Sequence, residues 1–214
     1  MNLQDKLLKQ FRKPSGWLGR LNVRDMNRRH SDLTDWGLQQ LTIKADDTIL
    51  DVGCGGGRTV QKLAAMAPNG KVYGVDFSQA SVDASRRLNR QSIGTRHVDI
   101  RLGPVSKLPF SDQTFDLVTA VETHFYWPDL PNDVREVMRV LKPGGIFMII
   151  TEAYKGGKLD QKIQIFAAAM KPLGYSHLTV DEHRELFLSA GYSEVRVSED
   201  YDKGWLAVMG KRPT

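Results

Sequence analysis

The chain has 214 residues, and its hydrophobic content of 41% and charged content of 26% are typical of one globular domain with a substantial core. A single cysteine, Cys54, excludes an internal disulfide framework and any multi-cysteine zinc site. No apolar run approaches the roughly 20 residues that a membrane-spanning helix needs, and residues 1–30 lack the pattern of a secretory signal, so we expect a cytoplasmic protein.

The net charge of +5 is concentrated at the N-terminus. Residues 1–30 hold eight Lys or Arg and two Asp, a net charge of +6, whereas residues 31–214 hold 22 basic and 23 acidic residues, a net charge of −1. Such a basic arm is compatible with contact to nucleic acid or to an anionic membrane. A solvated helix face explains it with fewer assumptions, so a nucleic-acid partner is an alternative that we do not favour.

Residues 1–41 are predicted to form a helical extension that covers the main domain, residues 42–214. Its helices are expected over residues 2–12, over residues 17–29, and from a cap at Ser31 or Thr34 to about residue 41. His30 and Trp36 are candidates for closing a ligand cleft from this extension. Packing is the simpler explanation for Trp36, because aromatic side chains dominate protein cores.

From residue 48 onward, predicted strands alternate with predicted helices. Short apolar runs predict strands over residues 48–52, 72–76, 97–102, 115–121, 146–151, 195–197 and 206–209. Helical spacing predicts helices over residues 58–67, 79–91 with Ser78 as cap, 130–141, and 180–190 with a Thr179–Glu182 capping box. The order predicts an α/β fold, a Rossmann-like, doubly wound, mainly parallel seven-stranded sheet with an antiparallel last strand. Residues 152–178 have no clear strand pattern and are a candidate substrate lid.

The first strand leads into a glycine-rich turn that precedes a helix, and this arrangement is typical of a nucleotide cradle. Glycine lets the backbone approach a ligand closely, and the helix N-terminus beyond it offers unpaired N–H groups. Asp76, at the end of the second strand, is suited to accept both hydroxyls of an adenosine ribose. The dinucleotide pattern G-x-G-x-x-G is absent, because Arg58 and Val60 stand where its third glycine would fall, and there is no P-loop.

Four segments together resemble the successive motifs of class I S-adenosylmethionine-dependent methyltransferases, and the likeness is greatest to the type 11 group that acts on small molecules. These segments are ILDVGCGGG (49–57), VYGVDFS (72–78), LPFSDQTFDLV (108–118) and LKPGG (141–145). The resemblance implies S-adenosylmethionine as cofactor and S-adenosylhomocysteine as product. It also implies that the methionine portion of the cofactor is surrounded by Asp51, Gly53, Gly55 and Gly57.

For the nucleoside portion, the resemblance implies that Asp76 holds the ribose hydroxyls and that Phe77 lies against the adenine. Residues 103–105 would line the other side of the adenine. The family commonly has an acidic residue where Pro104 falls, and proline offers neither that acceptor nor a backbone N–H. The N–H of Val105 would still be available to the ring.

Methyl transfer from a sulfonium is an in-line displacement, so the enzyme mainly aligns the reactants and excludes water. A base is needed only when the acceptor must lose a proton, and no metal site is expected. The acceptor side is predicted to follow the fourth strand. There Glu122 and His124 are candidate bases or orienting groups, and Tyr126 and Trp127 would line an apolar pocket or face the sulfonium by cation–π attraction. Glu122 is also assigned to the cofactor side, and Glu122, His124 and Tyr126 are the candidate catalytic residues.

The sequence therefore predicts a methyltransferase for a small-molecule acceptor. It determines neither the identity of that acceptor nor the oligomeric state of the protein. Two alternatives remain. One is an RNA or protein methyltransferase that uses the basic arm, although the fourth strand is not followed by the Asn/Asp-Pro-Pro-aromatic motif of base-amino methylases. The other is a cofactor-binding protein without activity, because a fold by itself never establishes chemistry.

Overall fold

The computed structural model describes residues 29–152 and 154–214. The helices predicted over residues 2–12 and 17–29 fall outside the described residues, apart from residue 29.

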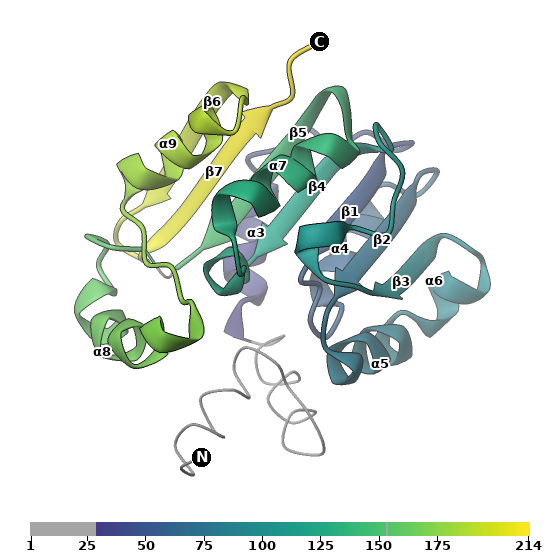
Figure 1. Cartoon of the computed structure of the whole chain (residues 1–214). Helices are drawn as coiled ribbons and strands as arrows, with labels where there is room; N and C mark the ends of the chain where they lie inside the picture. The colour runs from purple at the N-terminus through teal and green to yellow at the C-terminus, as the bar shows by residue number, and fades with distance from the viewer. Residues whose placement is uncertain (1–28, 153) are drawn as a thin grey trace.

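The described chain forms one seven-stranded sheet with the order β3-β2-β1-β4-β5-β7-β6, which runs from right to left in Figure 1. The strands are β1 (Thr48–Val52), β2 (Lys71–Asp76), β3 (Val98–Leu102), β4 (Phe115–Val121), β5 (Leu141–Thr151), β6 (Ser193–Asp200) and β7 (Trp205–Lys211). Strands β1 to β5 pair in parallel, whereas β7 is antiparallel to both β5 and β6. The predicted fold class, including the antiparallel last strand, is confirmed.

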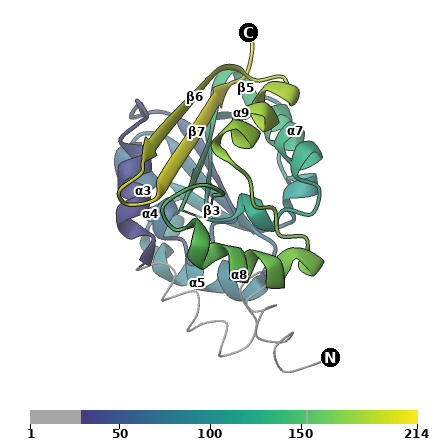
Figure 2. The same ribbon diagram turned by 90° about the vertical axis from the view of Figure 1, so that its left-hand side faces the viewer.

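Helices cover both faces of this sheet. They are α3 (Ser31–Leu38), α4 (Arg58–Met66), α5 (Gln79–Leu88), α6 (Arg90–Gly94), α7 (Leu130–Val140), α8 (Asp160–Met170) and α9 (Val180–Ser189). The part of the chain that the structure describes also has three short 3-10 helices, η1 (Val105–Lys107), η2 (His124–Tyr126) and η3 (Lys171–Leu173). Figure 2 shows the sheet nearly edge-on, with α3 and α4 on one side and α7 and α9 on the other.

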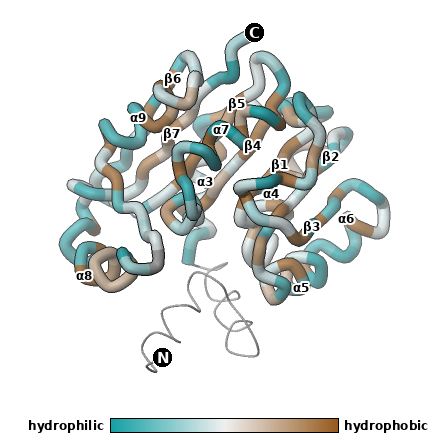
Figure 3. The backbone as a smooth tube through the Cα atoms, viewed as in Figure 1, coloured by the Kyte–Doolittle hydropathy of each residue, from teal (hydrophilic) through white to brown (hydrophobic). Residues whose placement is uncertain are grey.

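The core is divided by the sheet into two apolar clusters. One contains the inner faces of α7 and α9, and the other contains the buried side chains of α3, α4 and α5. Apolar residues accordingly concentrate along the central strands in Figure 3, while the helices mix apolar and polar residues. Within α3, Leu33 and Leu38 are both buried in the second cluster. This part of the predicted extension therefore shares its core with the main domain.

Side-chain hydrogen bonds cap α5 and α9 at their N-termini. The Ser78 hydroxyl accepts the N–H of Ser81 at the start of α5, and both reciprocal bonds of the predicted Thr179–Glu182 capping box are present at α9. The single helix predicted over residues 79–91 is wrong, because the chain divides at Asn89 into α5 and α6. The Asn89 side-chain amide donates to the carbonyls of Ser85 and Gly57, which ties this break to the glycine-rich turn.

The predicted cap of α3 at Ser31 or Thr34 is also wrong. The helix begins after His30, and no side chain caps it. The Thr34 hydroxyl instead donates to the carbonyl of His30 at 2.6 Å, as a hydroxyl inside a helix commonly does four residues back.

The strand order reverses at β1, which pairs with β2 on one side and with β4 on the other. In an open parallel sheet, ligands bind beyond the carboxyl ends of the strands at such a reversal. Throughout the described residues, each helix is too short or too polar to cross a bilayer.

Candidate active site

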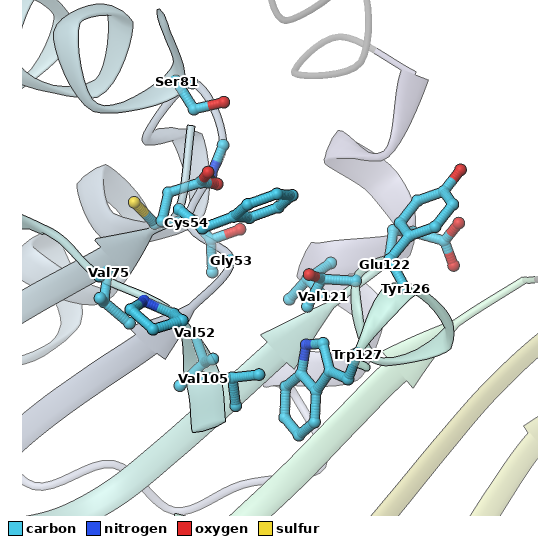
Figure 4. Close-up of a pocket in the computed structure, with 18 of the residues that line it drawn as sticks. Val52, Gly53, Cys54, Val75, Ser81, Val105, Val121, Glu122, Tyr126 and Trp127 are labelled. Carbon is cyan, nitrogen blue, oxygen red and sulfur yellow. The ribbon is translucent and has the colours of Figure 1, made fainter. Parts of the chain in front are cut away.

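A cavity of about 190 Å³ opens at the reversal point, beyond the carboxyl ends of β1, β2 and β4. One wall is the glycine-rich turn after β1, and the opposite wall is the segment after β4. Figure 4 shows Gly53, Cys54 and Ser81 on one side of this cleft and Glu122, Tyr126 and Trp127 on the other.

The glycine-rich turn is held against the end of β2 by its backbone. The N–H groups of Gly53 and Cys54 both donate to the carbonyl of Val75, at 2.8 and 3.0 Å. Gly55 has a φ of +50°, and a Cβ built on it would meet only the carbonyl oxygen of Gly53, at 3.9 Å. Since Gly55 also lines the cleft, the missing side chain leaves room there for a ligand to approach the backbone.

Asp76 forms the acidic end of the same wall. Its Oδ2 accepts the N–H of Gly55 at 3.0 Å, and its Oδ1 accepts the N–H of Ser78 at 2.8 Å. Burial raises the pKa of this carboxyl above its ordinary value, and the two N–H donors oppose that shift. The carboxylate is thus fixed in orientation and lines the cleft, next to the 38% exposed ring of Phe77.

Glu122 begins the opposite wall, where β4 ends. Its φ of +53° is unusual for a residue with a side chain, and its N–H donates to the carbonyl of Ile150 in the neighbouring strand. Its Oε1 accepts the N–H of Glu152 at 2.6 Å, which joins the ends of β4 and β5. Burial raises the pKa of the Glu122 carboxyl, while His30 opposes the shift.

Two aromatic side chains continue this wall. Burial raises the pKa of the Tyr126 hydroxyl, so the group remains a hydrogen-bond donor at neutral pH. Trp127 stacks on Phe147 with ring centroids 6.2 Å apart, and it is 4% exposed. The wall is therefore apolar beside Trp127 and polar beside Glu122.

Comparison with known proteins agrees with this geometry. The sequence profile of a family described as "Methyltransferase domain" matches residues 50–149. The demethylmenaquinone methyltransferase of Symbiobacterium thermophilum is 39% identical over 112 residues, which make up 52% of this chain and 45% of that protein. The corresponding protein of Anoxybacillus flavithermus is 31% identical over 66% of this chain and 60% of its own length.

The chain carries a methyltransferase domain over residues 50–149, and it is similar to the class I S-adenosylmethionine-dependent methyltransferases. It spans about half the length of the curated relatives that it matches. Among solved structures, a Haloferax volcanii methyltransferase in complex with the Trm112 methyltransferase activator superimposes with a TM-score of 0.77 at 23% identity. That superposition covers 90% of this chain and 94% of the other. At such low identity the likeness concerns the fold alone.

The residues of this methyltransferase fold fit the cofactor that the family uses. The open backbone at Gly55 suits the amino-acid end of S-adenosylmethionine, and the oriented carboxylate of Asp76 suits two ribose hydroxyls. Phe77 and Val105 both line the cleft and offer apolar contact to an adenine ring. Pro104 also lines it, and it cannot supply the acceptor for the adenine amino group that the family commonly has there.

Two residues that the motif assigned to the cofactor do not line the cleft. Asp51 is 2% exposed and accepts the Thr119 hydroxyl at 2.8 Å, so it bonds β1 to β4. Burial raises the pKa of Asp51 to about 7, Thr119 opposes this shift, and the nearby Asp76 adds to it. Gly57 begins α4, and a Cβ on it would collide with Ser85 and with the Asn89 amide. Both residues therefore stabilise the glycine-rich turn through contacts on the side that faces away from the cleft.

His124 likewise lies away from the cleft, contrary to the expectation that it faces an acceptor. It is fully buried, and its Nε2 is 2.9 Å from Nε2 of His183 in α9. The Nδ1 of His183 lies 2.7 Å from the carbonyl of Thr179 and is assigned as its donor, so His124 donates to His183. Burial lowers the pKa of both imidazoles, and the pair is neutral. The 3-10 turn of η2 directs His124 inward and Tyr126 toward the cleft.

The α3 region supplies two cleft residues, His30 and Thr34, that lie outside the family's matched segment. His30 appeared in the sequence only as a secondary candidate, and Thr34 was missed because a threonine in a helix carries no special signal. Trp36 packs against Trp205 with centroids 5.8 Å apart and takes no part in the cleft.

Residues 154–178 of the candidate lid (152–178) approach the acceptor wall from behind, whereas Glu152 at its start donates its N–H to Glu122 in that wall. Tyr175 and α8 pack around Phe125 and Tyr126 in a separate apolar cluster. Among the described residues 154–178, none lines the cleft.

Proposed function

We propose that this protein transfers the methyl group of S-adenosylmethionine to a small-molecule acceptor. The observation that carries the proposal is the continuous cleft in which Asp76 and the open backbone at Gly55 face a mixed polar and aromatic wall. The first side has the groups that a nucleoside sulfonium needs, and the second offers a surface for a second reactant.

The residues of the chain mainly position the cofactor and the acceptor, and they contribute less to the bond-making step itself. When bound, S-adenosylmethionine supplies a methyl group on a positively charged sulfur, which leaves as a neutral sulfide. Asp76 would fix the ribose and so the direction of the sulfur–methyl bond, which in-line displacement requires. Trp127, nearly fully buried, helps to keep water out of the reacting centre.

The acceptor would lie against the second wall. The Tyr126 hydroxyl can donate a hydrogen bond to it, while Glu122 and His30 form the polar end that receives its nucleophilic group. The apolar part of this wall favours an acceptor with a hydrophobic portion. Matched relatives include a cycloartenol-C-24-methyltransferase of Oryza sativa and a 27-O-demethylrifamycin SV methyltransferase of Amycolatopsis mediterranei.

Methyl transfer itself needs a direct test, because the fold also serves other chemistry. A [4+2]-cyclase superimposes on this chain with a TM-score of 0.67 at 18% identity. The first measurement is calorimetric titration of the full chain with S-adenosylmethionine and with S-adenosylhomocysteine. The second is methyl transfer from labelled cofactor to a panel of phenolic, quinol and sterol-like acceptors.

The matched variants are Asp76→Asn and Asp181→Asn, the latter an exposed carboxylate in the first turn of α9. Hydrogen bonds to a charged group contribute about 1.5–3 kcal/mol, so Asp76→Asn is expected to weaken cofactor binding roughly 10- to 100-fold. Asp181→Asn is expected to leave it unchanged. If the native chain binds neither compound, the proposal is wrong; binding without transfer to any acceptor would support the cofactor-binding alternative.

A further inference from the structure

Three side chains from separate elements meet at the polar end of the acceptor wall. His30 immediately precedes α3, Glu122 follows β4, and Glu152 follows β5. One ligand atom from each lies within 4.8 Å of the other two. The distances from His30 Nε2 are 3.6 Å to Oε1 of Glu152 and 3.9 Å to Oε2 of Glu122. Glu152 has no part in the function proposed above.

The 3.6 Å between the His30 and Glu152 atoms is close to the spacing of two ligands around an ion, and the 3.9 Å between the His30 and Glu122 atoms is slightly wider. A direct N–H···O hydrogen bond would bring nitrogen and oxygen to about 2.7–3.2 Å. Both observed distances are longer, although the groups attract one another. Two ligand atoms that each lie about 2.1 Å from a metal are about 3.4–3.6 Å apart at tetrahedral to trigonal angles. The three side chains therefore surround a space of the size that a small cation fills.

The charges point to the same occupant. Two carboxylates and an imidazole that binds a metal through an unprotonated nitrogen carry a charge of −2, which a divalent cation balances. The Glu122 side chain is 8% exposed and lies beside the Glu152 carboxylate, so two like charges are held close together. A cation among the three groups relieves that repulsion and replaces the lost hydration.

Independent contacts hold the Glu122 carboxylate and the backbone of the other two residues. The N–H of Glu152 donates to Oε1 of Glu122, which leaves Oε2 on the side of His30. The Thr34 hydroxyl holds the backbone of His30, and α3 packs closely on β5 where Gly37 meets the side chain of Ile150. Such fixed ligands lower the cost of assembling a metal site.

We propose that His30, Glu122 and Glu152 bind a divalent transition-metal cation, with Zn²⁺ and Mn²⁺ as the probes that this ligand set best fits. Imidazole suits zinc, carboxylates suit manganese, and three protein ligands leave a coordination position for a substrate. Because His30 and Glu122 line the cleft, that position faces the acceptor.

This proposal rests on the proposed methyl transfer. It adds that the acceptor is a molecule with a hydroxyl group. An oxygen bound to the cation loses its proton to solvent more readily. That oxygen then forms the bond to the methyl carbon, the carbon–sulfur bond breaks, and its electron pair stays on the sulfur as the neutral sulfide.

The test uses the full chain after treatment with a chelator that is then removed. Calorimetry with Zn²⁺ and with Mn²⁺, and electron paramagnetic resonance of bound Mn²⁺, are measured for the native chain and for His30→Ala, Glu152→Gln and Glu185→Gln. Glu185 lies exposed on α9 and serves as the matched control. We expect one cation per chain, binding at least about 10-fold weaker in His30→Ala and Glu152→Gln, and no change in Glu185→Gln.

Two outcomes overturn the metal site. One is no binding by the native chain, which would mean that a protonated His30 bridges the two carboxylates. The other is equal binding by all variants, which would mean that the cation binds elsewhere. Thermal melts of the variants identify any loss of folding, and Glu152→Gln preserves the backbone bond to Glu122. Cofactor titration of the chelator-treated chain separates the two proposals, because Asp76→Asn is expected to affect only cofactor binding.

Discussion

Substituting alanine for Gly55 and, separately, for Gly57 distinguishes the part of the glycine-rich turn that faces a ligand from the part that packs on the protein. Both residues have positive φ, +50° and +82°, so each alanine carries a left-handed backbone cost of about 1–2 kcal/mol. The two sites differ in what the new Cβ meets. At Gly55 the Cβ enters the cleft, whereas at Gly57 it lies 2.9 Å from Cα of Ser85 and 2.6 Å from Nδ2 of Asn89.

The expected magnitudes follow from these surroundings. Gly55→Ala should lose only the backbone cost in stability and weaken S-adenosylmethionine binding at least about 10-fold, which corresponds to 1.4 kcal/mol. Gly57→Ala adds an overpacking cost of about 1–3 kcal/mol to the backbone cost, for a total of about 2–5 kcal/mol. Its folded fraction should bind the cofactor nearly as the native chain does.

Urea unfolding monitored by circular dichroism gives the stabilities, and calorimetry at low temperature gives the affinities. The reasoning is refuted if Gly55→Ala binds the cofactor with native affinity. It is equally refuted if Gly57→Ala is as stable as the native chain yet fails to bind. Either result would mean that the exposed side of the turn has been assigned to the wrong glycine.

Two further predictions concern buried titratable groups. The pKa of Asp51 is raised to about 7, so its contribution to stability is present at low pH and is lost as the pH rises toward 7. Between pH 4 and pH 7.5, the free energy of unfolding of the native chain should fall by up to about 4 kcal/mol relative to that of Asp51→Asn. Urea unfolding at each pH measures both stabilities, and the same pH dependence in the two proteins would contradict this. The pKa of His183 is lowered, so its contribution is present above about pH 6.5 and is lost as the unfolded chain takes up a proton at lower pH. His183→Gln should therefore reduce the slope of stability against pH below 6.5 by up to about 1.4 kcal/mol per pH unit, and an unchanged slope would show that the imidazole pair titrates when folded.

The elements that carry a local signal were predictable from the sequence. Strand β1, the turn after it and Asp76 lie as expected, because apolar runs, glycines and a strand-ending carboxylate act over a few residues. The capping box at Thr179 formed for the same reason. The wall that we propose for the cofactor therefore follows largely from short-range patterns, although these patterns also assigned Asp51 and Gly57 to it, which do not line the cleft.

The acceptor side depends on contacts between residues distant in sequence. His124 looked catalytic because it follows Glu122 by two residues, yet its partner His183 is 59 residues away and could not be inferred. Glu152 gave the same signal as Glu122, since each follows a parallel strand. Only the adjacency of β4 and β5 brings the two carboxylates together, so the sequence carried no signal for the cluster of Glu122 and Glu152 with His30.

Because of the position of His30, the docking of α3 and the binding of a ligand in the cleft are thermodynamically linked. Leu33 and Leu38 anchor α3 in the core, while His30 at its N-terminal end lines the cleft. A ligand that contacts His30 binds only when α3 is docked, so the ligand must stabilise the docked helix by the same free energy that docking adds to its affinity. Residues 29–41 should therefore become more resistant to proteolysis as the acceptor wall is occupied. Substitutions of the buried Leu33 should weaken acceptor binding, although Leu33 itself does not contact the acceptor.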